Sequence, residues 1–312
     1  MSVSPRLETD GVGRHDAGGS MMSDEALFAE AMLESYRRAI ASVAAASGDI
    51  RAAALRLAAI WRGGGRLIYA GAGSSGLAAA EVAAELPGTF GLDASRIAIV
   101  LSGGTAEPFR IDGPAEDDAA GEQTMVELGD LTRDAVIALS ASGSTSFTVA
   151  APAEARDRGA FVIAIAHRPG SPLLAGADAP IFLDSGEEAL RGSTRLAAGT
   201  AQKAVLGMLS SLMGFELGHI HQCLMVDLKA DNAKLRERAR RIVATIAGVS
   251  GSRAARAGAK VKLAILIACG GVNMSEAVTW LAAAGGRIDA ALRCAVTKRI
   301  NEGRRPEQGS VA

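Results

Sequence analysis

Two segments rich in glycine and serine are the parts of this sequence best suited to bind a phosphate group. They are Gly71-Ala-Gly-Ser-Ser-Gly76 and Ser140-Ala-Ser-Gly-Ser-Thr145, and each lies between an apolar run and a helical pattern. The start of a helix offers free backbone N–H groups and a positive dipole end, and hydroxyl groups add further donors. We therefore expect both loops to line one crevice for a phosphorylated ligand, with the hydroxyls of Ser74, Ser75, Ser140, Ser142, Ser144 and Thr145 as donors.

The first segment also matches the G-x-G-x-x-G pattern of dinucleotide-binding folds. Those folds need an acidic residue at the end of the second strand to hold a ribose hydroxyl. Here the second apolar run, Arg96–Leu101, is followed by Ser-Gly-Gly without a carboxylate. A plainer interpretation is that these residues only form tight turns and helix caps. For one loop that interpretation is as good as ligand binding, and the presence of two loops favours a ligand site.

The segments that must position these loops predict a doubly wound α/β fold with a parallel sheet of about five strands. Five short runs are apolar throughout and are separated by helical stretches, which indicates a sheet covered on both faces. Helices are expected before the sheet and, as a small helical domain, after it, including a long apolar helix over 193–217 and an amphipathic, basic helix over 226–249. The runs lie at residues 66–70, 96–101, 135–140, 161–166 and 179–183.

Composition and charge exclude several classes of protein. A 312-residue chain with 49% hydrophobic residues is not mainly disordered, and a net charge of -1 argues against a nucleic-acid binder that relies on a basic surface. We expect no membrane association, because no apolar run is long enough to span a bilayer. Three widely spaced cysteines give neither a disulfide framework nor a zinc pattern, so we expect a protein of the reducing cytoplasm.

Together these motifs resemble the sugar isomerase (SIS) domain family. The loop at 140–145 carries the S-x-S-G-x-T pattern, and the stretch Gly192–Lys203, which includes Ser193, is the most specific match. With Leu224–Asp227, they are similar to the branch of N-acetylmuramic acid 6-phosphate etherases and glucokinase regulatory proteins. We expect a flexible tail over 1–22, a SIS domain of flavodoxin-like topology with its N-terminal helices over 23–222, a helical domain over 223–300 and a flexible tail over 301–312.

The resemblance implies that two glutamates carry the chemistry. Glu85, before Leu86-Pro87, corresponds to the family's acid that protonates the leaving group, and Glu116 corresponds to the partner acid or base. Glu188 matches a family glutamate near the substrate, and we expect Glu188 and Ser193 to contact the substrate. The family is dimeric with its sites near the interface, so we also expect a homodimer. Read from the residues alone, Glu85 is a solvated helix residue, and Glu116 belongs to an acidic loop.

The implied reaction cleaves the lactyl ether of a phosphorylated N-acetyl amino sugar, releasing D-lactate during the recycling of cell-wall peptidoglycan. This reaction needs no metal or redox cofactor, so the resemblance implies that the protein binds none. The sequence departs from the family at Leu77 and Ser144, where the family has arginine, and at Ala198, where it has lysine. These departures leave two alternatives open. They are an aldose–ketose isomerase of sugar phosphates and a non-catalytic sugar-phosphate sensor.

Overall fold

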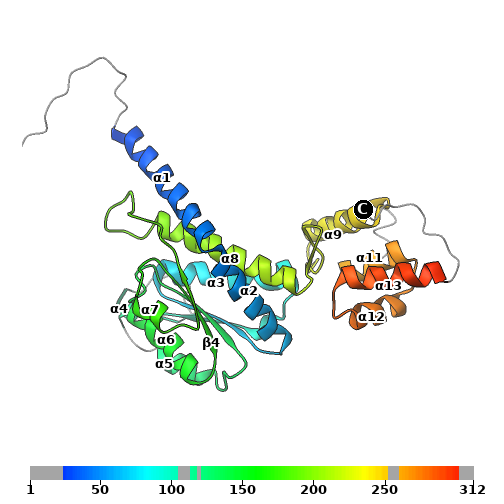
Figure 1. Cartoon of the computed structure of the whole chain (residues 1–312), viewed down its shortest axis with the longest axis horizontal. Coiled ribbons are helices and arrows are strands. Elements are labelled where there is room, and N and C mark those ends of the chain that lie inside the picture. The colour runs from blue at the N-terminus through cyan, green and yellow to red at the C-terminus, as the bar shows by residue number, and fades with distance from the viewer. Residues whose placement is uncertain (1–23, 105–112, 118–120, 252–259, 302–312) are drawn as a thin grey trace, which may run out of the picture.

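The computed structural model describes residues 24–104, 113–117, 121–251 and 260–301. Two helices, α1 (Asp24–Ala45) and α2 (Ser47–Arg62), precede a five-stranded sheet. Helix α1 packs against α8 (Ala197–Glu216) with its C-terminal part, while its N-terminal part projects away from the sheet (Figure 1). The predicted tail over 1–22 and nearly all of the second predicted tail lie outside the described residues.

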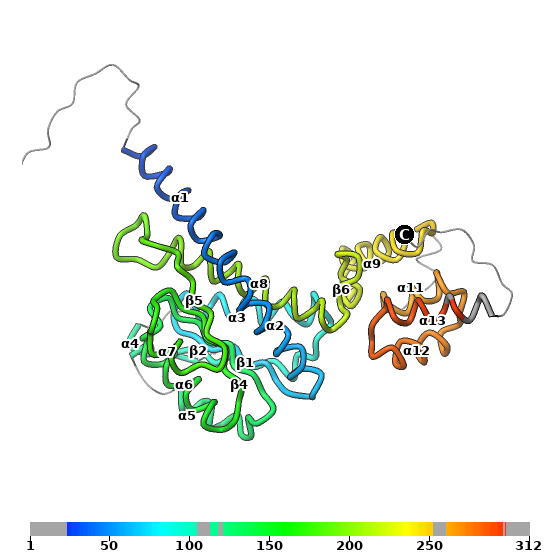
Figure 2. Tube along the Cα trace, viewed as in Figure 1, coloured from blue at the N-terminus to red at the C-terminus, as the bar shows by residue number. Residues whose placement is uncertain are grey.

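The sheet is parallel, with the strand order β2-β1-β3-β4-β5. This order confirms the expected doubly wound fold, since the chain moves outward from β1 in one direction and from β3 in the other. Figure 2 traces the chain through the sheet and the helices around it. The carboxyl ends of β1 and β3 therefore flank the switch point, where ligands bind in such sheets. The strands are β1 (Leu67–Gly71), β2 (Ile97–Leu101), β3 (Ala135–Leu139), β4 (Phe161–Ala166) and β5 (Ala179–Phe182).

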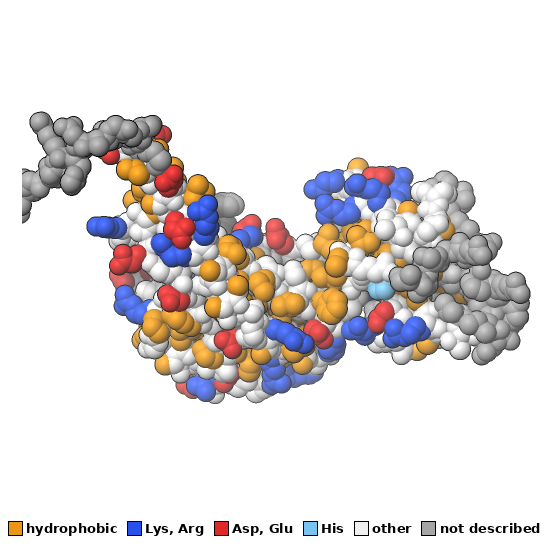
Figure 3. All heavy atoms as spheres, turned by 45° about the horizontal axis from the view of Figure 1, so that its top comes forward, with side chains coloured by type: hydrophobic (Ala, Val, Ile, Leu, Met, Phe, Trp, Pro, Cys, Tyr) orange, Lys and Arg blue, Asp and Glu red, His pale blue; other side chains and the backbone are white. Residues whose placement is uncertain are grey.

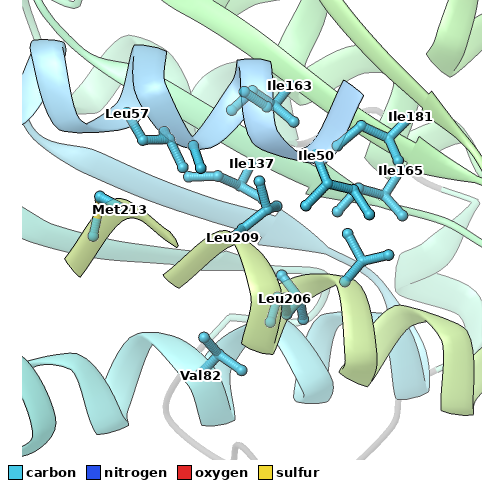
Figure 4. Close-up of a cluster of buried hydrophobic side chains, with 14 of the residues drawn as sticks. Ile50, Leu57, Val82, Ile137, Ile163, Ile165, Ile181, Leu206, Leu209 and Met213 are labelled. Atoms are coloured by element: carbon cyan, nitrogen blue, oxygen red, sulfur yellow. The ribbon is translucent and has the colours of Figure 1, made fainter. Parts of the chain in front are cut away.

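Alternate side chains of each central strand enter two separate cores, because successive residues of a strand point to opposite faces. Ile137 and Ile163 face helices α1, α2, α3 (Gly73–Phe90) and α8 in the larger core, part of which Figure 4 shows. Val136 and Val162 face the other core. That second face is covered by α5 (Gly121–Glu127), α6 (Ser146–Asp157) and α7 (Pro172–Ala175). Burial on both faces explains why the strands are apolar throughout.

The C-terminal part differs from the expected run of helices. A two-stranded hairpin, β6 (Ile220–His221) and β7 (Leu224–Met225), follows α8. The helix predicted over 226–249 begins only at Ala233, since the Asn232 side chain accepts a hydrogen bond from the Leu235 N–H and caps the helix there. The remaining helices are α9 (Ala233–Ala247), α11 (Val261–Gly270), α12 (Met274–Ala283) and α13 (Ile288–Asn301).

Within the described ranges, no single helix is both long and apolar enough to cross a bilayer. Helices α11 and α12 reach the length and apolar composition of a membrane span only when they are taken together, and the chain bends by 110° between them.

Candidate active site

The first glycine-rich loop turns directly from β1 into helix α3. A Cβ at Gly71 would lie 2.8 Å from the Cα of Gly76, so the loop closes only without side chains at this contact. Ala72 occupies the N-cap position, and no described side chain caps the helix. The first turn of α3 therefore presents backbone N–H groups and a positive dipole end at the switch point of the sheet.

The carboxylate of Glu116 lies against this helix start. Glu116 belongs to the short helix α4 (Gly113–Glu116), and its Oε1 would be 2.5 Å from a Cβ at Gly73, a residue with a φ of +54°. Only glycine leaves room for the carboxylate and tolerates this backbone conformation readily. The structure thus brings Glu116 to the first predicted loop, although Gly73 and Glu116 are 43 residues apart in the sequence. Neither the loop motif nor the acidic segment indicates this contact by itself.

In the second loop the hydroxyl groups are organised around Ser140. Its Oγ accepts a hydrogen bond from the Gly143 N–H at 3.1 Å and lies 3.1 Å from the Thr145 Oγ1. The Ser142 Oγ accepts hydrogen bonds from the N–H and the hydroxyl of Ser144, both at 3.2 Å. Buried Ser140 therefore fixes the shape of the loop, while partly buried Thr145 and Ser142 and exposed Ser144 are accessible at the start of α6.

The two serines of the first loop differ in environment. Ser74 is exposed, whereas Ser75 is buried and donates its hydroxyl proton to the Oε1 of Gln202, on α8, at 3.0 Å. The Nε2 of Gln202 is buried, and no residue in the part of the chain that the structure describes forms a hydrogen bond with it. The sequence motifs do not identify Gln202 individually as a candidate site residue. Its position within the Gly192–Lys203 stretch, which resembles the family, is the sequence feature that could indicate a role.

Glu188 caps the start of α8. Its two carboxylate oxygens accept hydrogen bonds from the backbone N–H groups of Leu196, Ala197 and Ala198 at 3.0–3.1 Å. A carboxylate at a helix N-terminus is favoured by the helix dipole. Ser193, in the preceding turn, donates its hydroxyl to the backbone oxygen of Leu190 at 2.8 Å. Both predicted residues thus build the entrance to α8, and their contact with a substrate stays a prediction.

Partly buried His167, just after β4, lies beside this cap. Its Nδ1 is 2.8 Å from the Ser185 Oγ, and its Nε2 atom is buried without a hydrogen-bond partner among the described residues. Burial lowers the pKa of His167 from 6.5 to about 4, while the negative charge of Glu188 and a hydrogen bond to the Leu183 backbone oppose this shift. The imidazole is therefore neutral at physiological pH.

Glu85 is not brought to Glu116 within one chain. It is exposed on α3, three turns beyond Gly73, which corresponds to about 18 Å along the helix axis. On the same helix Glu81 forms an ion pair of 2.8 Å with Lys203 of α8. Among the residues that the structure describes, no group of three or more His, Cys, Asp or Glu side chains could hold a metal ion.

Two hydroxyl-rich loops at the switch point of a parallel sheet, with a carboxylate at one of them, agree with a SIS domain protein. The family model described as SIS domain matches residues 18–167. Relatives named N-acetylmuramic acid 6-phosphate etherase come from Deinococcus radiodurans, with 38% identity over 85% of this chain and 88% of theirs, and from Rubrobacter xylanophilus, with 40% identity over 96% and 94%. The chain belongs to the N-acetylmuramic acid 6-phosphate etherase family, as the sequence motifs predicted.

A relative of the same name from Streptomyces avermitilis is 41% identical over 82% of this chain and 84% of its own length. Among solved structures, a phosphoheptose isomerase from Francisella tularensis matches with a TM-score of 0.46 and 19% identity, over 62% of this chain and 100% of that chain.

Proposed function

We propose that this protein is a carbon–oxygen lyase that cleaves N-acetylmuramic acid 6-phosphate into D-lactate and N-acetylglucosamine 6-phosphate. The observation that carries the proposal is the contact of the Glu116 carboxylate with Gly73, at the start of α3. It adds an acid–base group to a phosphate-binding fold in a chain that is about 40% identical to relatives named as etherases of this compound. The proposed setting is the cytoplasm, in the recycling of peptidoglycan sugars.

The two loops differ in the groups they present. The second loop offers hydroxyl groups and the N-terminus of α6, and within the described ranges no carboxylate accepts a hydrogen bond from those hydroxyls, so it suits the dianionic phosphate. At the first loop the Glu116 carboxylate would repel a phosphate but is suited to proton transfer. We therefore place the phosphate at Ser140–Thr145 and the reacting carbons of the sugar near Gly73.

The reaction then proceeds by elimination and hydration. In the ring-opened sugar the proton on C2 is acidic because C2 is adjacent to the aldehyde. Glu116 removes this proton, the C3–O bond breaks, and Glu85 protonates the departing lactate oxygen. Water then adds to C3 while a proton returns to C2, so protons and electrons balance without a redox step. These are the roles that the family resemblance implies for the two glutamates.

The distance between these glutamates within one chain supports a homodimer whose partner supplies Glu85. Glu85 is exposed in the single chain. A residue that completes the site of a partner subunit must be exposed in this way before the two subunits associate. Helix α1 also exposes large apolar side chains (Figure 3), and surfaces of this kind mark protein interfaces. Those side chains are Leu27 (53% exposed), Phe28 (44%), Leu33 (53%) and Ile40 (52%).

We also propose that the chain divides into a SIS domain over 23–222 and a helical domain over 223–300. The two cores of the sheet contain no buried residue beyond Leu217 in the described chain. A third cluster begins at Val226 and includes Ile265, Leu266 and Ile288 from the C-terminal helices. Separate cores favour separate folding units.

The proposed reaction is tested by incubating the purified full-length chain with N-acetylmuramic acid 6-phosphate and assaying D-lactate. We expect stoichiometric lactate and N-acetylglucosamine 6-phosphate, and almost complete loss of turnover in Glu116→Gln with binding of the product retained. Asp117→Asn, which removes the exposed neighbouring carboxylate, is the matched control. Isomerisation or binding of hexose 6-phosphates without lactate release would contradict the proposal.

The shared site is tested by mixing two inactive variants, Glu85→Gln and Glu116→Gln. If each site takes one glutamate from each chain, half of the randomly formed dimers are mixed and each contains one intact site. We then expect about a quarter of the wild-type activity to return after subunit exchange. A mixture that stays inactive, although the chains exchange, would contradict a site shared between subunits.

A further inference from the structure

A buried pair of polar side chains links helix α8 to the start of α3. Gln202 is 2% exposed and Ser75 is 9% exposed, and both lie beside the larger apolar core, near Ala79, Ala201 and Val205. The Ser75 hydroxyl donates to the Gln202 Oε1 at 3.0 Å. This arrangement leaves the two protons of the Gln202 Nε2 without an acceptor in the described chain.

A buried N–H group without a hydrogen-bond acceptor is costly, on the order of 1–3 kcal/mol, and is rarer in proteins than a carbonyl oxygen that lacks a donor. The oxygen and nitrogen of a glutamine amide have nearly the same shape, so the group also fits after a half-turn about its last bond. After this rotation the Gln202 Nε2 donates to the Ser75 Oγ. The hydroxyl proton of Ser75 is then free to donate elsewhere.

The proposed function supplies a candidate acceptor for that proton. Ser75 lies in the first turn of α3, whose start holds the Glu116 carboxylate. The rotation keeps one hydrogen bond between Ser75 and Gln202 and frees the hydroxyl proton, so the rotated amide gains stability when that proton finds an acceptor. A sugar oxygen bound next to Glu116 is an acceptor of this kind.

We propose that Gln202 is a positioning residue whose amide turns to donate to Ser75 when the substrate binds, so that Ser75 donates its hydroxyl proton to an oxygen of the sugar. The inference rests on the proposed function, since it needs a sugar phosphate at the first loop. Gln202 acts only through Ser75 and does not touch the substrate. Removal of the amide therefore has no further effect on ligand affinity once the Ser75 hydroxyl is absent.

The experiment is a double-mutant cycle on ligand affinity. Calorimetric titration with N-acetylglucosamine 6-phosphate gives the dissociation constants of wild type, Ser75→Ala, Gln202→Met and the double variant. We expect Ser75→Ala to weaken binding about tenfold, as the loss of one ligand hydrogen bond would. Gln202→Met should weaken it several-fold, and the double variant should bind no worse than Ser75→Ala alone. Effects that multiply in the double variant would overturn the inference.

Two further variants keep the result interpretable. Ser210→Ala removes another buried hydroxyl from α8, one that donates to the Gly207 backbone oxygen, and should leave affinity unchanged. If Gln202→Met does not fold, Gln202→Glu at about pH 8 replaces it, because an ionised carboxylate can only accept the Ser75 proton and should match Ser75→Ala in affinity. Wild-type affinity in Gln202→Glu would overturn the inference.

The outcomes also separate this inference from the proposed function. If the wild type releases D-lactate but the effects of Ser75→Ala and Gln202→Met on affinity multiply in the double variant, only the proposed role of Gln202 is overturned. A wild-type protein that binds the sugar phosphate without releasing lactate overturns the proposed reaction, while the cycle still decides the role of Gln202. If the wild type does not bind the sugar phosphate, both proposals fail.

Discussion

The carboxylate of Glu116 occupies the space that a side chain at position 73 would need. An ideal Cβ at Gly73 would lie 2.5 Å from the Glu116 Oε1 and 3.3 Å from its Cδ. Gly73 therefore does more than allow a tight turn, because it admits the carboxylate to the start of α3. This contact places a negative charge at the first loop, whereas the described hydrogen bonds of the second loop join hydroxyl and backbone groups, so the two loops offer different chemistry.

Gly73→Ala should remove most of the activity by displacing Glu116. The added methyl group overlaps the carboxylate, and the φ of +54° costs an L-residue about 1–2 kcal/mol. We expect kcat/KM for lactate release to fall by at least about tenfold. Gly285→Ala is the control, since Gly285 has a φ of +62° but open space around its Cβ. Equal losses of activity in both variants would show that backbone strain, and not Glu116, is responsible.

Gly143→Ala should impair phosphate binding at the second loop. Gly143 has a φ of +67°, and its Cβ would lie 2.5 Å from the Cβ of buried Ser171. The loop must shift, which breaks the hydrogen bond from the Gly143 N–H to the Ser140 Oγ. We expect KM to rise about tenfold, equivalent to the loss of roughly one hydrogen bond to a charged group, as measured by steady-state kinetics.

Gly170→Ala separates the steric effect from the backbone effect at that loop. Gly170 has a φ of +66°, nearly the same as that of Gly143, but nothing lies within 4 Å of its added Cβ. The control should lose only the stability that the backbone conformation costs, and it should keep its KM. An unchanged KM in Gly143→Ala would argue against the placement of the phosphate at this loop.

The sheet could be predicted from the sequence because its residues are selected by burial on two faces. The run Leu67-Ile68-Tyr69-Ala70 places Leu67 and Tyr69 in one core and Ile68 and Ala70 in the other, so every position is apolar. Loops at the carboxyl ends of such strands share one edge, which made the pairing of the two glycine-rich loops predictable. That part of the site follows from local patterns.

Contacts between distant segments left no such local pattern. The approach of Glu116 to Gly73, the Ser75–Gln202 pair and the cap formed by Glu188 depend on how helices and loops pack. The error over 226–232 has the same origin, because the hairpin ends with Val226 N–H bonded to the His219 oxygen and not to a helical partner. Apolar periodicity cannot distinguish such a segment from a helix turn.

Glu188→Gln should destabilise the protein even without substrate. The amide retains one acceptor oxygen but turns an NH2 group toward N–H donors at the start of α8, and it loses the favourable interaction of a negative charge with the helix dipole. We expect the free energy of unfolding in urea to fall by ~1–3 kcal/mol. Glu187→Gln is the control, since the Glu187 side chain is exposed. Among the described residues, the backbone oxygen of Glu187 accepts a hydrogen bond from Arg38. Equal stability of the two variants would contradict the capping role.

His167 should make the protein less stable as the pH falls below neutrality. The unfolded chain binds a proton with a pKa of about 6.5, while burial lowers the pKa of His167 in the folded chain to about 4. Below pH 6.5 the unfolded state therefore takes up more protons, so the stability that His167 contributes is complete above that pKa and lost as the pH falls toward 4. Compared with His167→Asn, the wild type should lose about 2 kcal/mol of unfolding free energy between about pH 7.5 and pH 5. Because the other titrating groups, including His219 and His221, are present in both proteins, their contributions cancel in the difference. A difference between wild type and variant that does not change over this pH range would mean that His167 is not kept neutral by burial.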